Sequence, residues 1–263
     1  SSAYNEIAKI YFSSQEWENS EYYIKEAIRL DPDKKWYYFL LIDLYIIQNK
    51  IEEQLEVCND LIQMDPENYG YYIQKLYVLK ELGDHKKSQK FISQIKLKFG
   101  QSTELLLEQK AVYIASGDFK SAEDILLALI KKAPTNTIYF SELAELYMLE
   151  SNYDQAISAY TKLLEINPNS PDAILALYHI YKNKDDVESQ EKYLLMITKN
   201  NQISLEKKRD LFYRLLQENN DNENRSFKQI VEKAIVVYPE EPLFNLILGD
   251  IYTKESRHKK AIF

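Results

Sequence analysis

The chain has 263 residues and a formal net charge of −8 at neutral pH, with 45% hydrophobic residues, 28% charged residues and only 5 Gly and 7 Pro. This composition fits one large folded domain or a repeat array, and the scarcity of Gly and Pro argues against a loop-rich β fold. Because nucleic-acid binding depends on clustered Lys and Arg, the acidic balance argues against a nucleic-acid partner.

Helix-terminating residues recur at a fixed interval along the chain. Four prolines lie 34, 68 and 34 residues apart, at Pro32, Pro66, Pro134 and Pro168. Proline cannot donate a hydrogen bond to the helix ladder, so each one predicts the end of a helix. Gly100, which also terminates helices, fills the gap in the series. The interval predicts serial copies of one unit.

In chain order, we expect helical hairpins over residues 1–34, 35–68, 69–102, 103–136, 137–170, 171–204 and 205–241, and a truncated copy over 242–263. The copies differ in detail. In the first and second hairpins, Ser20 and Gln54 occupy a position where a small residue lets the two helices approach, so we expect looser packing at Gln54. The polar run ENNDNENR at residues 218–225 predicts a solvated loop in the seventh copy.

The clearest copy is Thr137 to Ser170. Its two apolar helix faces have the spacing i, i+3, i+4 and i+7, and are formed by Phe140, Leu143, Ala144 and Tyr147, then by Tyr153, Ala156, Tyr160 and Leu163. Ser151 and Asn152 break the first helix, Pro168 stops the second, and Ser170 is expected to cap the next helix, which begins at Pro171.

Small Ala144, Tyr147, aromatic Tyr153, small Ala156, Tyr160 and Pro168, at their fixed spacing, resemble the tetratricopeptide repeat (TPR). The resemblance covers the whole chain as about seven and a half repeats and extends to bacterial multi-repeat scaffold proteins. It implies an all-α fold, with residues 1–263 forming a single α–α superhelix (TPR solenoid). It also implies that the first helices line a concave inner wall and the second helices form the outer wall.

Residues that could support catalysis or metal binding are isolated. His85, His179 and His258 lie in different copies, and Cys58, the only cysteine, is expected to be a buried, inert thiol. Lys207, Lys208 and Arg209 are expected to be a solvated basic run. We therefore expect no enzyme activity, cofactor or metal in this segment. The most apolar run, residues 36–47, is too short to span a membrane.

The resemblance implies that a protein or peptide partner lies along the inner wall of repeats 2 to 5. The residues carried over to that wall are Trp36, Phe39, Ile46, Ile73, Tyr77, Leu107, Ile114, Ile138 and Met148. Some of these positions also pack against the neighbouring first helix in such arrays. From the sequence, Trp36 and Phe39 are therefore either partner contacts or inter-repeat core. A clamp for a C-terminal carboxylate is disfavoured, because repeats 2 and 3 lack the set of Asn, Lys and Arg that such a clamp uses.

The leading hypothesis is a non-catalytic scaffold that holds a peptide or helical segment of a partner in the groove. One alternative is a structural module that self-associates through its repeat ends. Another is a regulatory region of a larger protein with an enzymatic domain elsewhere. Because the chain begins without Met and ends within an expected helix, we expect it to be part of a longer protein. Its Asn, Lys, Ile and Tyr content resembles that of envelope proteins from AT-rich bacteria, which favours the bacterial periplasm or envelope over the cytoplasm.

Overall fold

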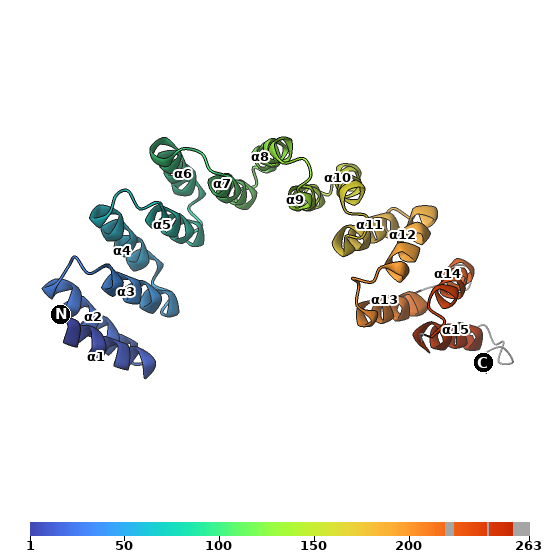
Figure 1. Cartoon of the computed structure of the whole chain (residues 1–263), viewed down its shortest axis with the longest axis horizontal. Helices are drawn as coiled ribbons and strands as arrows, with labels where there is room; N and C mark the ends of the chain where they lie inside the picture. Colours follow the sequence, from blue (N-terminus) through green and yellow to red (C-terminus); the bar gives the residue numbers. More distant parts are fainter. Residues whose placement is uncertain (219–223, 241, 255–263) are drawn as a thin grey trace. The chain divides into compact units, whose positions relative to one another are not determined.

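The structure is a computed structural model that describes residues 1–218, 224–240 and 242–254. The described residues form 15 helices, arranged as successive hairpins, and contain no strand (Figure 1). The predicted all-α fold of helix–turn–helix repeats is therefore confirmed. Most of the predicted loop at 218–225, the second helix of the truncated repeat, and His258 lie outside the described residues.

The chain forms two compact units, Ser1–Ile125 and Leu126–Phe263. The first unit contains α1 (Ser2–Ser13), α2 (Trp17–Leu30), α3 (Lys35–Ile47), α4 (Ile51–Met64), α5 (Tyr69–Glu81), α6 (His85–Phe99) and α7 (Thr103–Ala115), and α8 (Phe119–Lys132) spans the boundary. The second contains α9 (Thr137–Leu149), α10 (Tyr153–Ile166), α11 (Pro171–Asn183), α12 (Val187–Lys199), α13 (Leu205–Glu218), α14 (Asn224–Val237) and α15 (Pro242–Lys254). That the repeats form one continuous solenoid stays a prediction.

The turn inside each of the first six hairpins contains one residue in the left-handed backbone region. These residues recur every 34 positions, with φ between 54° and 77°, at Gln15, Asn49, Gly83, Gly117, Ser151 and Asp185. In most of these turns the following N–H donates to a tyrosine carbonyl five residues back, as from Asn152 to Tyr147 at 2.8 Å. This is the Schellman closure of a helix end, so the 34-residue period is built into the backbone itself.

The second helices end where the sequence predicts. α2, α4, α8, α10 and α14 each end two residues before a proline. α6 instead ends at Phe99, and Gly100 follows with φ 83°. Asn136 and Asn152 cap α9 and α10 by accepting hydrogen bonds from backbone N–H groups. Ser170 lies at the predicted capping position of α11, but its side chain makes no capping hydrogen bond there.

Small residues are buried where the two helices of a hairpin approach closely. Ala144 and Ala156 are fully buried between α9 and α10, and Ser20 is fully buried against Ala8, whose carbonyl accepts its hydroxyl proton at 2.9 Å. Gln54 is buried at the corresponding place in α4. That it loosens the packing of the second hairpin stays a prediction.

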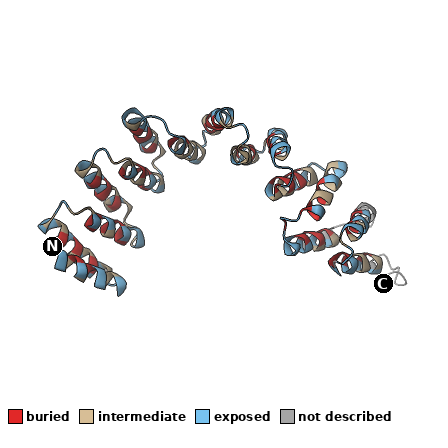
Figure 2. Ribbon diagram, viewed as in Figure 1, coloured by how far each residue is buried: buried red, intermediate tan, exposed pale blue. Residues whose placement is uncertain are grey.

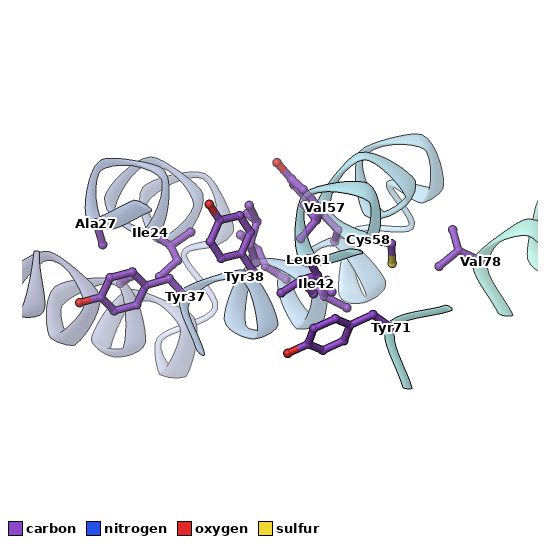
Figure 3. Close-up of a cluster of buried hydrophobic side chains, with 14 residues drawn as sticks. Ile24, Ala27, Tyr37, Tyr38, Ile42, Val57, Cys58, Leu61, Tyr71 and Val78 are labelled. Carbon is purple, nitrogen blue, oxygen red and sulfur yellow. The ribbon is translucent and has the colours of Figure 1, made fainter. Parts of the chain in front are cut away.

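In the first unit the core lies between neighbouring hairpins as well as within them. Buried residues gather on the helix faces that meet, and exposed residues occupy the opposite faces (Figure 2). One cluster joins α1 to α5 and contains Tyr37, Tyr38, Cys58, Leu61 and Tyr71, among others (Figure 3). Because no single hairpin buries both of its apolar faces, each hairpin depends on its neighbours for stability.

Candidate functional site

Helix α3 is apolar around most of its circumference, yet only part of it is buried. Its core face supplies Tyr37, Tyr38, Leu41, Ile42, Leu44 and Tyr45. The opposite face leaves four large apolar side chains between 40% and 57% exposed: Trp36, Phe39, Ile46 and Ile47. A helix that is apolar all round is normally buried all round, so packing within this unit does not explain the second face.

One aromatic contact links the exposed face of α3 to the buried side of α5. The rings of Phe39 and Tyr71 lie 6.1 Å apart, centroid to centroid, and join the two helices. Tyr77 of α5 is 46% exposed. We define the α3–α5 surface as Trp36, Phe39, Ile46, Ile47 and Tyr77. Scattered exposed apolar residues are common on proteins, but several on adjacent helices indicate an interaction site.

Tyr77 is held in place by an ion pair between α5 and α7. Lys80 Nζ lies 2.6 Å from Glu108 Oε2, and the Tyr77 hydroxyl donates to Glu108 Oε1 at 3.2 Å. Lys80 Nζ also lies 5.0 Å from the centre of the Tyr77 ring. Both charged side chains are partly buried, so water screens this pair less than an exposed one. The network therefore orients the ring at the edge of the α3–α5 surface.

The structure places the other predicted residues of the first unit differently. Ile73 is only 6% exposed and belongs to a core cluster with Leu76, Phe91 and Leu105, so it does not lie on the surface where the sequence placed it. The reason is that this face of α5 packs into the neighbouring hairpins, whereas the equivalent residue of α3, Phe39, faces outward. Leu107 and Ile114 of α7 are half-buried.

The second unit carries the remaining two predicted residues on α9. Ile138 is well exposed and Met148 is half-buried. Leu149, which follows Met148, is as exposed as Ile138. Leu149 and Ile47 have the same position in their repeats, the thirteenth, which the resemblance also places on the inner wall.

A hollow in the second unit escaped the sequence prediction. It has a volume of about 440 Å³, lies between α13 and α15, and is lined by Leu205, Glu206, Arg209, Tyr213, Pro242, Leu243 and Leu246. These are first-helix positions of the last two repeats. Glu206 and Leu243 correspond to Trp36, Arg209 and Leu246 to Phe39, and Tyr213 to Tyr77. The sequence did not predict this hollow for two reasons. Glu206 and Arg209 make the first helix of its repeat look polar, and the apolar lining comes from two separate helices.

A second hollow, of about 610 Å³ in the first unit, is lined by Leu82, Gly83, Asp84, His85, Lys86, Gln89 and Ser116. It lies at the turn between α5 and α6. Asp84 accepts the backbone N–H of Lys87 at 3.0 Å and so caps α6. The Asp84 carboxylate thus caps α6, and Lys86 is the other charged residue in the lining.

Cys58 and Lys208 contribute to the fold and form no reactive site. Cys58 is buried, and burial raises the pKa of its thiol to about 11, which leaves little reactive thiolate at neutral pH. Lys208 was predicted to be solvated, but it is only 5% exposed and donates to the Thr198 carbonyl at 3.0 Å. This bond satisfies the carboxyl end of α12, a place that favours a cation. Lys207 and Arg209 are exposed, as predicted.

The described residues contain neither a candidate metal site nor a candidate membrane-spanning helix. No group of three or more His, Cys, Asp and Glu side chains gathers there as a metal site would require. None of the helices described is both long and apolar enough to cross a bilayer.

The comparisons with known proteins match individual repeats. Residues 1–34 and residues 138–170 each match a family model described as tetratricopeptide repeat. The chain is 27% identical over 131 residues to the E3 SUMO-protein ligase RanBP2 of Homo sapiens. That match covers 46% of this chain but only 4% of the human protein, so the similarity is confined to a small part of that protein.

Solved structures share the fold at low sequence identity. PilW, a type IV pilus biogenesis factor, has a TM-score of 0.51 at 17% identity and covers 80% of this chain and 97% of its own. A tetratricopeptide repeat protein from Parabacteroides merdae has a TM-score of 0.50 at 15% identity, covering 86% and 89%. These structures show a shared fold. The matched repeats and the 34-residue backbone period identify the chain as a tetratricopeptide repeat protein.

Proposed function

We propose that this protein is an interaction scaffold that binds a peptide or helical segment of a partner protein on the α3–α5 surface. Tetratricopeptide repeats generally mediate protein–protein interaction, and that general role applies to this chain. The observation that supports the particular surface is the second apolar face of α3. Its four large side chains remain exposed although the opposite face of the same helix is fully used by the core.

The composition of the surface also favours a protein partner. Trp and Tyr are among the residues that contribute most binding energy at protein interfaces, because they bury a large area at little cost in conformational entropy. Trp36 is flanked by Tyr37 in an edge-on contact, with ring centroids 5.8 Å apart, and Lys34 lies over it at 5.0 Å. A side chain positioned in this way loses little further freedom on binding.

The double substitution Trp36→Ala/Phe39→Ala tests the proposal. Each side chain is about half exposed, and covering that apolar area contributes roughly 1 to 1.5 kcal/mol per residue. Their joint removal should therefore weaken binding by about 2 to 3 kcal/mol, or roughly 30- to 150-fold in Kd. The ligands are peptides selected on the full chain from a phage-displayed random library, and Kd is measured by fluorescence anisotropy.

The chain offers a matched control in the same unit. Tyr22 of α2 and Leu97 of α6 are more exposed than Trp36 and Phe39, at 61% and 90%, but lie on second helices. Tyr22→Ala/Leu97→Ala removes a comparable apolar area and should leave Kd within about twofold. If this control weakens binding as much as Trp36→Ala/Phe39→Ala does, the peptides recognise exposed apolar area in general and the assignment is wrong.

Self-association is the alternative to a partner protein. Light scattering across a range of concentrations separates the two. A dimer that disappears in Trp36→Ala/Phe39→Ala would assign the α3–α5 surface to a second copy of the chain. The bacterial periplasm and an enzymatic domain elsewhere stay predictions.

A further inference from the structure

Asp43 interrupts the exposed apolar face of α3. It follows Phe39 by four residues and precedes Ile46 and Ile47 by three and four, so all these side chains share one face of the helix. The Asp43 side chain is exposed, and its carboxylate has no ion pair or hydrogen bond with any residue that the structure describes. Partial burial by its surroundings raises the pKa of this carboxyl group.

Carboxylates elsewhere between the hairpins of this unit are neutralised within the chain. Asp65 lies 2.7 Å from Lys35 Nζ, and Glu108 lies 2.6 Å from Lys80 Nζ. The lysines that flank the amino end of α3 are therefore already engaged, Lys35 with Asp65 and Lys34 with the Trp36 ring. Lys34 also precedes Asp43 by nine residues, about 13 Å along the helix.

A solvated carboxylate on a helix is ordinary. Asp60 is an example in this unit and serves as a comparison for Asp43. Asp60 of α4 is exposed, and burial is the largest cause of a raised pKa for its carboxyl group as well. The exposed residues beside Asp60 are polar, namely Glu56, Asn59 and Gln63. Asp43 differs because Phe39, Ile46 and Ile47 surround it, so any segment that covers them also covers the carboxylate.

We propose that the segment bound on the α3–α5 surface carries a Lys or Arg that pairs with Asp43, with apolar residues on both sides of that cation. One apolar group covers Trp36 and Phe39, and the other covers Ile46 and Ile47. This inference rests on the proposed function and specifies the chemistry of the partner.

The physical reason is the cost of covering a charge. An apolar or acidic segment would remove water from Asp43 without replacing its hydrogen bonds, which is unfavourable. A basic residue at that point offsets the loss through a charge-assisted hydrogen bond. Asp43 therefore selects among apolar segments by penalising those that lack a cation.

The test uses the full chain and a phage-displayed random dodecapeptide library. Pools selected on the wild type should be enriched in peptides with one Lys or Arg between apolar residues. Asp43→Asn keeps the shape and removes the charge, so it should weaken binding of those peptides about tenfold. Replacing the peptide's basic residue by norleucine should weaken wild-type binding to a similar degree. The same replacement should have little effect on Asp43→Asn.

Asp60→Asn is the matched control and should leave every Kd unchanged. The inference is overturned if the selected peptides show no enrichment in Lys or Arg, or if Asp43→Asn changes Kd by less than twofold. In that case a loss of binding in Trp36→Ala/Phe39→Ala would still support the surface itself. If neither variant affects any selected peptide, or if no peptide is selected, the proposed function fails together with this inference.

Discussion

At the scale of single residues, the turns inside the hairpins set the period of the molecule. Each needs one residue with positive φ, and only two of the first six turns use glycine, Gly83 and Gly117. A residue with a Cβ atom in this conformation is strained by about 1 kcal/mol. The sequence predicted the turn at Ser151. It did not single out Gln15 or Asp185, because residues other than glycine adopt positive φ only in a minority of cases.

These turns give a pair of opposite predictions. Gly83→Ala should destabilise the protein by about 1 kcal/mol, since a Cβ atom there would meet no neighbour within 4 Å and the effect is purely one of backbone strain. Ser151→Gly should stabilise it by up to about 0.5 kcal/mol, because relief of strain exceeds the extra freedom of glycine in the unfolded chain. Urea unfolding followed by circular dichroism measures both. Shifts of the same sign in the two variants would contradict this explanation of the period.

At the scale of helices, small residues lie where the two helices of the clearest hairpin cross. Ala144 and Ala156 are fully buried between α9 and α10. Ala144→Leu should therefore force the helices apart and destabilise the protein by about 2 to 3 kcal/mol in urea unfolding. Ser158→Leu, at an exposed position of α10, is the control and should change stability by about 0.5 kcal/mol or less. Equal effects would show that the crossing has room for a larger side chain.

Helix boundaries could be predicted closely, whereas the exposure of individual apolar residues could not. Prolines and small residues act locally, so their effect can be recognised from the sequence. Whether Phe39 faces outward and Ile73 inward depends on which neighbouring side chains reach each helix, and those come from other repeats. The sequence therefore left Trp36 and Phe39 open between surface and core. It also missed the hollow between α13 and α15, which needs two helices about 37 residues apart in the chain.

At the scale of the whole molecule, the repeats carry out two tasks with one pattern. Second helices and the buried faces of first helices hold the hairpins together, and the outward face of α3, together with Tyr77 of α5, still exposes large apolar side chains. The partner is thus expected on first helices of the first unit and not on second helices that are equally apolar at single positions.

Site-specific photo-crosslinking tests whether a bound peptide contacts first helices or second helices. The photoreactive residue p-benzoylphenylalanine is placed at Phe39 on α3 or, in a separate protein, at Leu97 on α6, and each is irradiated with a peptide selected on the wild type. We expect a covalent adduct from position 39 and none above background from position 97. An adduct from position 97 with none from position 39 would contradict this expectation.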